Sequence, residues 1–221
     1  MQGIYGFDNS YMLDTAERYP GVFGIVATID HVNRNPKERM DELKERGVQG
    51  FRIVASPGKS QNWLDDNGYE TMFRTAADNN QAICPLTHPE GLPDLDRMCG
   101  KHPETTVVVD HMARIGELGP IEEEKINQLC KLAGHPNVHV KISRLHSLGD
   151  KKPPHQELIP MIKRVIDSFG PDRIMWGSDS PYQVVTESYS DSINLIRDHL
   201  DLSASERQSI LNDTAARLFF A

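Results

Sequence analysis

The chain has 221 residues, 38% hydrophobic and 25% charged, a composition typical of one globular domain, which we place over residues 1–221. Its formal net charge of −8 argues against general nucleic-acid binding, because a surface that binds phosphates needs a basic face. No apolar run approaches the roughly 20 residues that span a bilayer, so we expect no membrane insertion.

Strand-like and helix-like segments alternate along the chain. Apolar, β-branched runs predict strands, and each is followed by a segment of helical character. In chain order we predict a helix at 9–19, a strand at 22–29, a helix at 35–46, a strand at 48–54, a helix at 69–79, a strand at 82–87, a helix at 92–100, a strand at 105–109, a helix at 122–133, a strand at 138–142, a helix at 155–169, a strand at 173–177, and helices at 189–199 and 204–219. This alternation predicts an α/β fold with a parallel sheet, either a barrel or an open doubly wound sheet.

Local signals place several boundaries. The Asn35–Pro36 pair supplies an N-cap and a first-turn proline, and Gly47 ends the helix that they open. Ser203–Glu206 forms a capping box, residues 56–68 read as a polar loop, and Pro160 is expected to disturb the early part of its helix. No strand is followed by Gly-x-Gly-x-x-Gly, and a P-loop is absent, which argues against a nucleotide-binding sheet.

Cysteine usage indicates a reduced compartment. Cys84, Cys99 and Cys130 are odd in number and widely spaced, which argues against a disulfide framework or a zinc knuckle. Residues 1–9 lack the basic-then-apolar order of a signal peptide. We therefore expect a cytoplasmic protein.

Polar side chains stand where several predicted strands end. His88 follows the strand at 82–87, Asp110 and His111 follow the strand at 105–109, and Asp179 follows the strand at 173–177. In a β/α barrel these ends meet on one face, where such side chains converge. Imidazoles can bind a metal or orient a carbonyl oxygen, and a carboxylate can accept a proton from attacking water. Zinc suits this set of nitrogen and oxygen ligands, so the pattern predicts a hydrolytic site.

Each of these residues also has a structural interpretation. A histidine just after a strand is usually a loop or capping residue, and Asp179 can simply start a turn. Lys141 reads as a solvated charge near a strand end. Arg52 lies among apolar residues and needs an acidic or polar partner if it is buried.

The remaining histidines carry weaker signals. His135 and His139 flank a Pro-Asn pair and are interpreted as surface residues. His31 follows the first predicted strand, where it can face a cleft. His146 and His155 lie in or beside the polar loop at 143–154, on the side where substrate contact is expected.

Five segments together resemble the amidohydrolase-related family of metal-dependent hydrolases, in particular its branch of sugar-lactone and pyrone-dicarboxylate lactonases. These segments are 5–11, 47–52, 108–111, 140–143 and 173–181. The resemblance implies a TIM-barrel fold in which His88, His111 and Asp179 are ligands of a divalent metal, with zinc as the first choice. It also implies that Arg52, His88, His111 and Tyr182 contact the substrate.

The sequence departs from the family pattern at its start. The family opens with a strand ending in His-x-His, which occurs nowhere in this sequence, and a segment like 5–11 normally follows the second strand. We therefore expect an incomplete barrel of about six β/α units that lacks the first two. Its exposed edges predict pairing into a homo-oligomer. Some lactonases of this branch work without a metal, so a metal-free site stays open.

The resulting expectation is a hydrolase that opens a small, anionic lactone, or a related ester or amide, with water activated by Asp179. Two alternatives are kept. One is a metal-dependent decarboxylase of the same superfamily, which carbon dioxide release would reveal. The other is a truncated, non-catalytic relative that acts as a binding or assembly partner.

Overall fold

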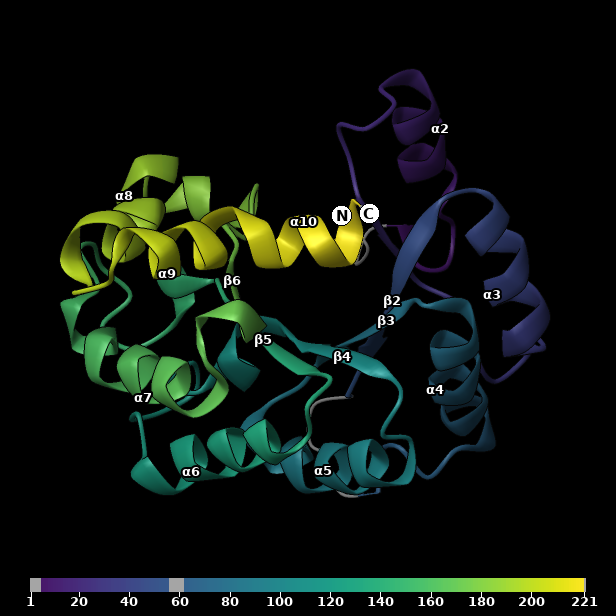
Figure 1. The fold of residues 1–221 in the computed structure, drawn as a ribbon, viewed down its shortest axis with the longest axis horizontal. Helices are drawn as coiled ribbons and strands as arrows, with labels where there is room; N and C mark the ends of the chain where they lie inside the picture. Colours follow the sequence, from purple (N-terminus) through teal and green to yellow (C-terminus); the bar gives the residue numbers. More distant parts are fainter. Residues whose placement is uncertain (1–4, 56–61, 221) are drawn as a thin grey trace.

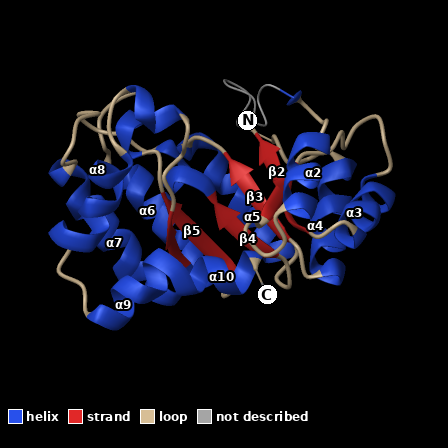
Figure 2. Cartoon of the chain, turned by 90° about the horizontal axis from the view of Figure 1, so that it is seen from above, coloured by secondary structure: helices blue, strands red, loops and turns tan. Residues whose placement is uncertain are grey.

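The computed structural model describes residues 5–55 and 62–220. Six strands of these residues form one sheet, in which neighbouring strands are parallel and follow the order of the chain. The strands are β1 (Ile25–Ala27), β2 (Val48–Val54), β3 (Ala82–Leu86), β4 (Thr106–Val109), β5 (Val138–Ile142) and β6 (Ile174–Trp176). The sheet curls into part of a barrel with helices around it (Figures 1 and 2), which confirms the predicted barrel-like α/β fold.

The helices between successive strands cover the outside of the curled sheet, one helix precedes the first strand, and the last helices follow the sixth strand (Figure 1). They are α2 (Ser10–Arg18), α3 (Pro36–Glu45), α4 (Asn67–Asn79), α5 (Leu92–Lys101), α6 (Glu123–Lys131), α7 (Ile159–Phe169), α8 (Tyr189–Asn194), α9 (Ala204–Gln208) and α10 (Thr214–Phe219). The main core lies between the outer face of the sheet and these helices, where Phe51, Leu95 and Ile162 are fully buried.

Helix α10 lies on the opposite, inner face of the sheet, across from α5 and α6 (Figure 1). A second core cluster joins Phe219 of this helix to inward-facing side chains of the strands, among them Cys84, Val108 and Met175. The approach is close, because a Cβ added at Gly24 would stand 2.6 Å from the carbonyl oxygen of Phe219. Glycine just before β1 therefore lets the last helix fill the concave side of the sheet.

Local sequence signals set most helix ends. The Asn35 side chain accepts a hydrogen bond from the backbone N–H of Lys37, at 3.2 Å, and Gly47 adopts a left-handed φ of +79° where the chain leaves that helix. Ser203 and Glu206 form the predicted capping box at the start of α9. These boundaries match the sequence prediction because they depend on contacts within a few residues.

Other boundaries differ from the prediction. The first strand covers three residues, 25–27, instead of 22–29. Helix α7 starts at Ile159 and not at residue 155, because Pro160 takes a first-turn position where its missing N–H costs nothing. The predicted loop at 56–68 lies partly outside the described residues, at 56–61, and its last two residues belong to α4. The segments predicted as helices at 189–199 and 204–219 contain π-helical stretches, at 195–199 after α8 and at 209–213 between α9 and α10.

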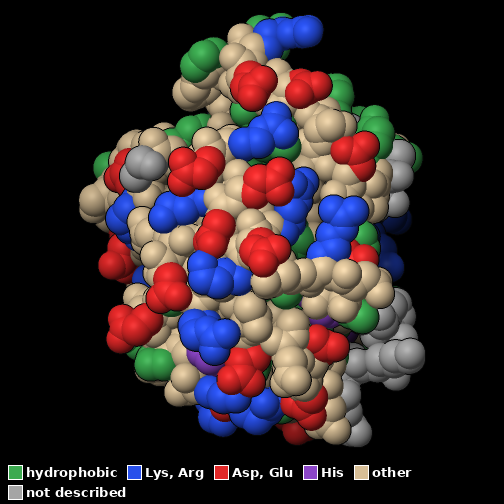
Figure 3. Space-filling view, turned by 90° about the vertical axis from the view of Figure 1, so that its right-hand side faces the viewer, with side chains coloured by type: hydrophobic (Ala, Val, Ile, Leu, Met, Phe, Trp, Pro, Cys, Tyr) green, Lys and Arg blue, Asp and Glu red, His purple; other side chains and the backbone are tan. Residues whose placement is uncertain are grey.

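The surface over α2, α3 and α4 carries acidic and basic side chains in alternation, without a gathered basic patch on that face (Figure 3). Within the described residues, no helix combines the length and apolar character needed to cross a bilayer.

Candidate active site

Three turns, each directly after a strand, place their side chains close together, and each turn contains a residue with strained backbone. His111 after β4, Arg144 after β5 and Asp179 after β6 have left-handed φ values of 57°, 62° and 64°. Such conformations in non-glycine residues cost about 1–3 kcal/mol each and concentrate at functional sites. The strongest case follows β4, where the run from His111 to Arg114 is left-handed throughout.

A buried group of charges lies beneath these turns. Asp110 is fully buried, accepts a hydrogen bond from Lys141 Nζ at 2.8 Å, and forms an ion pair with Arg52 Nη2 at 2.9 Å. Burial alone would raise the pKa of Asp110, but Lys141 and Arg52 outweigh it and hold the pKa at about 2. Lys141 is therefore not the solvated charge expected from the sequence, and Arg52 has the acidic partner that its apolar surroundings demanded.

His111 connects this group to the strand-end carboxylate. Its Nδ1 lies 2.7 Å from the Ser143 hydroxyl, and its Nε2 lies 3.7 Å from Asp179 Oδ1. Burial, helped by the cationic neighbours Arg52 and Lys141, lowers the pKa of His111 to about 3. The imidazole is therefore neutral near pH 7, and Nδ1 can either accept the proton of the Ser143 hydroxyl or donate its own proton to it.

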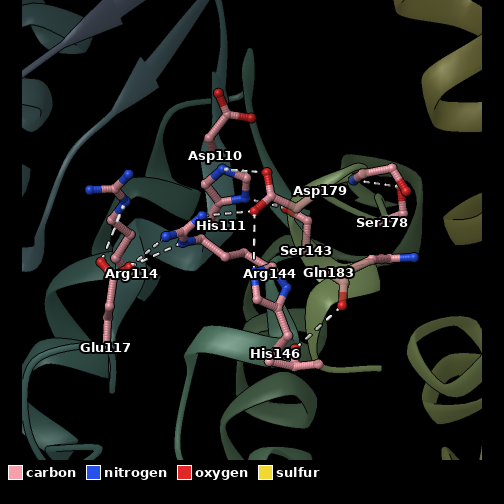
Figure 4. Close-up of polar contacts among 12 residues, drawn as sticks. Asp110, His111, Arg114, Glu117, Ser143, Arg144, His146, Ser178, Asp179 and Gln183 are labelled. Carbon is pink, nitrogen blue, oxygen red and sulfur yellow. Dashed lines mark hydrogen bonds and ion pairs between the residues drawn. The ribbon is translucent and has the colours of Figure 1, made fainter. Parts of the chain in front are cut away.

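Asp179 is held from one side by Arg144, whose Nη1 donates to Oδ2 at 2.8 Å (Figure 4). His146 approaches the same oxygen, with Nε2 at 3.8 Å. Oδ1 is thus the oxygen left facing His111. Arg144 was not singled out from the sequence, although it directly follows the segment 140–143 that carries part of the family resemblance.

His88 occupies a second, adjoining part of the site. Its Nε2 lies 3.3 Å from Arg114 Nη1 and 3.8 Å from Glu117 Oε2, and Glu117 also accepts from Arg144 Nε at 3.0 Å. Burial, and then the charge of Arg114, lowers the pKa of His88. The structure therefore brings His111 and Asp179 together, while His88 is linked to Asp179 through Glu117 and Arg144.

The described residues do not fit the zinc site that the family resemblance implied. No group of three or more His, Cys, Asp or Glu side chains in residues 5–55 and 62–220 is arranged to hold a metal ion. Arg144 donates to Asp179, and Arg114 Nη1 lies 3.3 Å from His88 Nε2, so cationic side chains already contact these two candidate ligands. A zinc ion needs free ligand atoms at about 2.0–2.2 Å.

The other residues that the sequence suggested near the site differ in how deeply they are buried. Tyr182 is about half exposed, and its backbone N–H donates to the carbonyl oxygen of Asp179 at 3.0 Å. His146 reaches Asp179, whereas His155 is fully buried against Glu187. His139 is buried and not a surface residue, because it lies within β5.

Comparison with protein families matches residues 1–221 to the family described as Amidohydrolase. The chain belongs to the amidohydrolase family. It is similar to an L-fucono-1,5-lactonase from Burkholderia ambifaria, with 28% identity over 83% of this chain and 64% of the lactonase. It is also similar to a 4-sulfomuconolactone hydrolase from Rhizobium radiobacter, with 27% identity over 98% of this chain and 72% of that enzyme. The chain thus spans less than two thirds of the fuconolactonase.

The fold of this amidohydrolase is shared with a solved structure. An amidohydrolase from Burkholderia multivorans, crystallised with bound zinc, superposes with a TM-score of 0.82 at 24% identity. The match covers 95% of this chain and 78% of that protein. The likeness confirms the incomplete barrel predicted from the sequence.

Proposed function

We propose that this amidohydrolase hydrolyses an anionic lactone and that Asp179 is the base that activates water. One observation carries the proposal. Three different strand ends, each with a left-handed residue, bring together Asp179, His111 and Arg144. Asp179 lies 3.7 Å from His111 Nε2 and accepts from Arg144 Nη1 at 2.8 Å. Strain that recurs at one place on three turns is typical of a functional site. Both sequence relatives are named for lactone hydrolysis, which supports the ester bond of a lactone ring as the bond that is hydrolysed.

In the proposed reaction Asp179 accepts a proton from water as the water oxygen bonds to the lactone carbonyl carbon. The ring C–O bond then breaks, and Asp179 returns the proton to the leaving alkoxide, which gives a hydroxy acid. Arg144 occupies Oδ2 and so aims Oδ1 at the reacting water. The 3.7 Å between Oδ1 and His111 Nε2 is too long for a direct hydrogen bond, so both atoms can address the same substrate.

His111 is proposed to polarise the carbonyl as a neutral donor. When Nδ1 accepts the proton of the Ser143 hydroxyl, Nε2 carries its own proton and can donate it toward the carbonyl oxygen. A donor aimed at the oxygen that gains charge in the transition state contributes about 3–4 kcal/mol in comparable sites. The low pKa of His111 keeps it in this neutral form near pH 7.

The charge of the site favours an anionic substrate. Four cationic side chains surround it, with three carboxyl groups between them: Arg52, Arg114, Lys141 and Arg144, with Asp110, Glu117 and Asp179. With neutral histidines this leaves excess positive charge in a chain whose formal net charge is −8. A positive cleft in an acidic protein concentrates anions at that cleft.

The test is a panel of lactones that includes carboxylated unsaturated rings and neutral sugar lactones. We expect ring opening by the wild-type chain and a fall in kcat of at least about 100-fold in Asp179→Asn. Asp201→Asn, the same change at an exposed loop residue, should leave kcat unchanged. Release of carbon dioxide would show that the reaction is a decarboxylation and not a hydrolysis. Absence of ring opening across the panel would overturn the proposal.

A further inference from the structure

A buried polar pair lies outside the chemistry described so far. His155 Nε2 and Glu187 Oε2 are in hydrogen-bond contact, and their side chains are 0% and 1% exposed. A glutamate is almost never buried to this degree unless it is paired. Replacement of a buried pair of ionisable groups by apolar side chains is often neutral or stabilising. Stability alone therefore gives little reason for the His155–Glu187 pair.

The His155–Glu187 pair joins the two segments that meet at Asp179. His155 belongs to the segment between β5 and α7, which also carries Arg144 and His146. Glu187 belongs to the segment between β6 and α8, which carries Asp179. Arg144 and His146 contact Asp179 near the start of these segments (Figure 4), and the pair joins them near their ends. The two segments are therefore held together at two separate places.

The chain between Asp179 and Glu187 is stiffened by turns. The backbone N–H of Tyr182 donates to the carbonyl oxygen of Asp179 at 3.0 Å, and that of Glu187 donates to the carbonyl oxygen of Gln183 at 2.9 Å. A single 3-10 turn, Tyr182–Val185, fills the space between these bonds, and Gln183 within it is fully buried. A displacement of Glu187 is therefore passed on to Asp179, because no flexible stretch separates the two.

The backbone at His155 has the same kind of strain as the turns of the active site. Its φ is 57°, compared with 62° at Arg144 and 64° at Asp179. Left-handed conformations of this kind persist only where the surrounding contacts hold them, and they concentrate at functional sites. Both contacts between the two segments therefore involve a strained residue.

The buried polar side chains of these two segments are incompletely hydrogen-bonded. Across residues 5–55 and 62–220, the atoms His146 Nδ1, His155 Nδ1 and Glu187 Oε1 are buried without a hydrogen-bond partner, as are both polar atoms of the Gln183 side chain. Burial lowers the pKa of His146, whereas the carboxylates of Asp179 and Glu187 raise it, so both charges act on this imidazole. Each unsatisfied buried group costs about 1–3 kcal/mol. Natural proteins accept such costs mainly at functional sites, which indicates a role beyond stability.

We propose that His155 and Glu187 are positioning residues that hold Asp179 where Arg144 can occupy its Oδ2. This rests on the proposed function, in which Asp179 is the base. Both side chains of the pair are shielded from solvent, so they act through the backbone and not on the substrate. Loss of the pair should therefore lower kcat, because the base moves away from the reacting water, and should leave KM nearly unchanged.

The kinetic test uses a lactone that the wild type opens. Glu187→Ala removes the contact, and we expect kcat to fall at least about 10-fold with KM changed less than about 3-fold, since a misplaced catalytic group can cost about 100-fold. Glu187→Gln keeps an oxygen to which His155 can donate and should recover most of kcat. Leu129→Ala, at a fully buried position of α6, is the control for lost stability alone and should keep the wild-type kcat. An unchanged kcat in folded Glu187→Ala would overturn the proposal.

A structural measurement covers the case in which Glu187→Ala does not fold. His155→Asn removes the imidazole, and asparagine adopts a left-handed φ readily, so the strained turn is retained. Circular dichroism confirms folding. A crystal structure of His155→Asn should show Asp179 Oδ2 more than about 3.2 Å from Arg144 Nη1, beyond hydrogen-bond distance. An intact contact between Asp179 and Arg144 in this variant would also overturn the proposal.

Failure of the positioning role and failure of the proposed function give different results. A displaced Asp179 in His155→Asn, without ring opening by the wild type, would sustain the positioning role and reject the hydrolase. Ring opening by the wild type, with a full kcat in folded Glu187→Ala, would sustain the hydrolase and reject the positioning role.

Discussion

At the scale of single residues, His111 is an imidazole that the fold keeps from ionising. It is about 5% exposed, it lies between the Ser143 hydroxyl and the Asp179 carboxylate, and its pKa is lowered to about 3. In the unfolded chain an imidazole has a pKa near 6.5. Between these values the unfolded state binds a proton that the folded state does not, so folding stability must fall as the pH falls.

This difference predicts a stability loss of about 3 kcal/mol from pH 7 to pH 4 that depends on His111. Urea unfolding of the wild type and of His111→Gln at several pH values should show a flatter pH dependence for the variant. His199→Gln, at an exposed position, should keep the wild-type slope. Identical slopes for the wild type and His111→Gln would contradict the assignment of a buried, neutral imidazole.

At the scale of elements, α10 takes a position that depends on one small residue. It covers the inner face of the sheet, and Phe219 at its end packs above Cys84 and Val108 and lies 5.9 Å from Lys141 Nζ. The helix and β1 approach each other at Gly24, where a side chain would meet the backbone of Phe219. The last helix therefore seals the apolar base beneath the buried charges of the site.

Gly24→Ala should therefore lower the free energy of unfolding by about 1–3 kcal/mol, the usual cost of overpacking a close contact. Gly134→Ala is the matched control, because a Cβ there meets no atom within 4 Å. Denaturant titration of both variants measures the difference. A Gly24→Ala chain as stable as the Gly134→Ala control would show that α10 is free to move away from the sheet.

At the scale of the whole molecule, exposed aromatic side chains gather before the first strand of the sheet. Tyr5, Tyr11, Tyr19 and Phe23 are each about half exposed, and they precede β1, which is the terminal strand of the described sheet. Apolar surface beside a sheet edge is a favourable place for association. The homo-oligomer expected from the sequence stays a prediction, and this surface is where we place it.

Multi-angle light scattering of the wild type should show association that increases with protein concentration. Phe23→Lys should shift the distribution toward the monomer, because it places a charge within the apolar surface. Leu118→Lys, which changes an even more exposed apolar residue elsewhere, should have no such effect. A wild-type chain that stays monomeric at high concentration would count against association at this edge.

The sequence by itself determined the succession of strands and helices, because periodicity and caps act over a few residues. Val48–Val54 and Val138–Ile142 form strands with the predicted bounds, and Asp179 and His111 were recognised as strand-end residues that a parallel sheet would bring together. Boundaries were wrong where tertiary contacts set them, as for β1, whose short pairing with β2 ends the strand at Ala27.

Only the tertiary structure decided which charges meet. Lys141 and Arg52 come from β5 and β2, and nothing in their local sequence indicates that both bind Asp110. Arg144 and Glu117 lie 27 residues apart and meet because two strand-end turns face each other. A sequence shows which side chains can do chemistry, but burial, pKa values and ion pairs depend on distances across the sheet, which folding alone establishes.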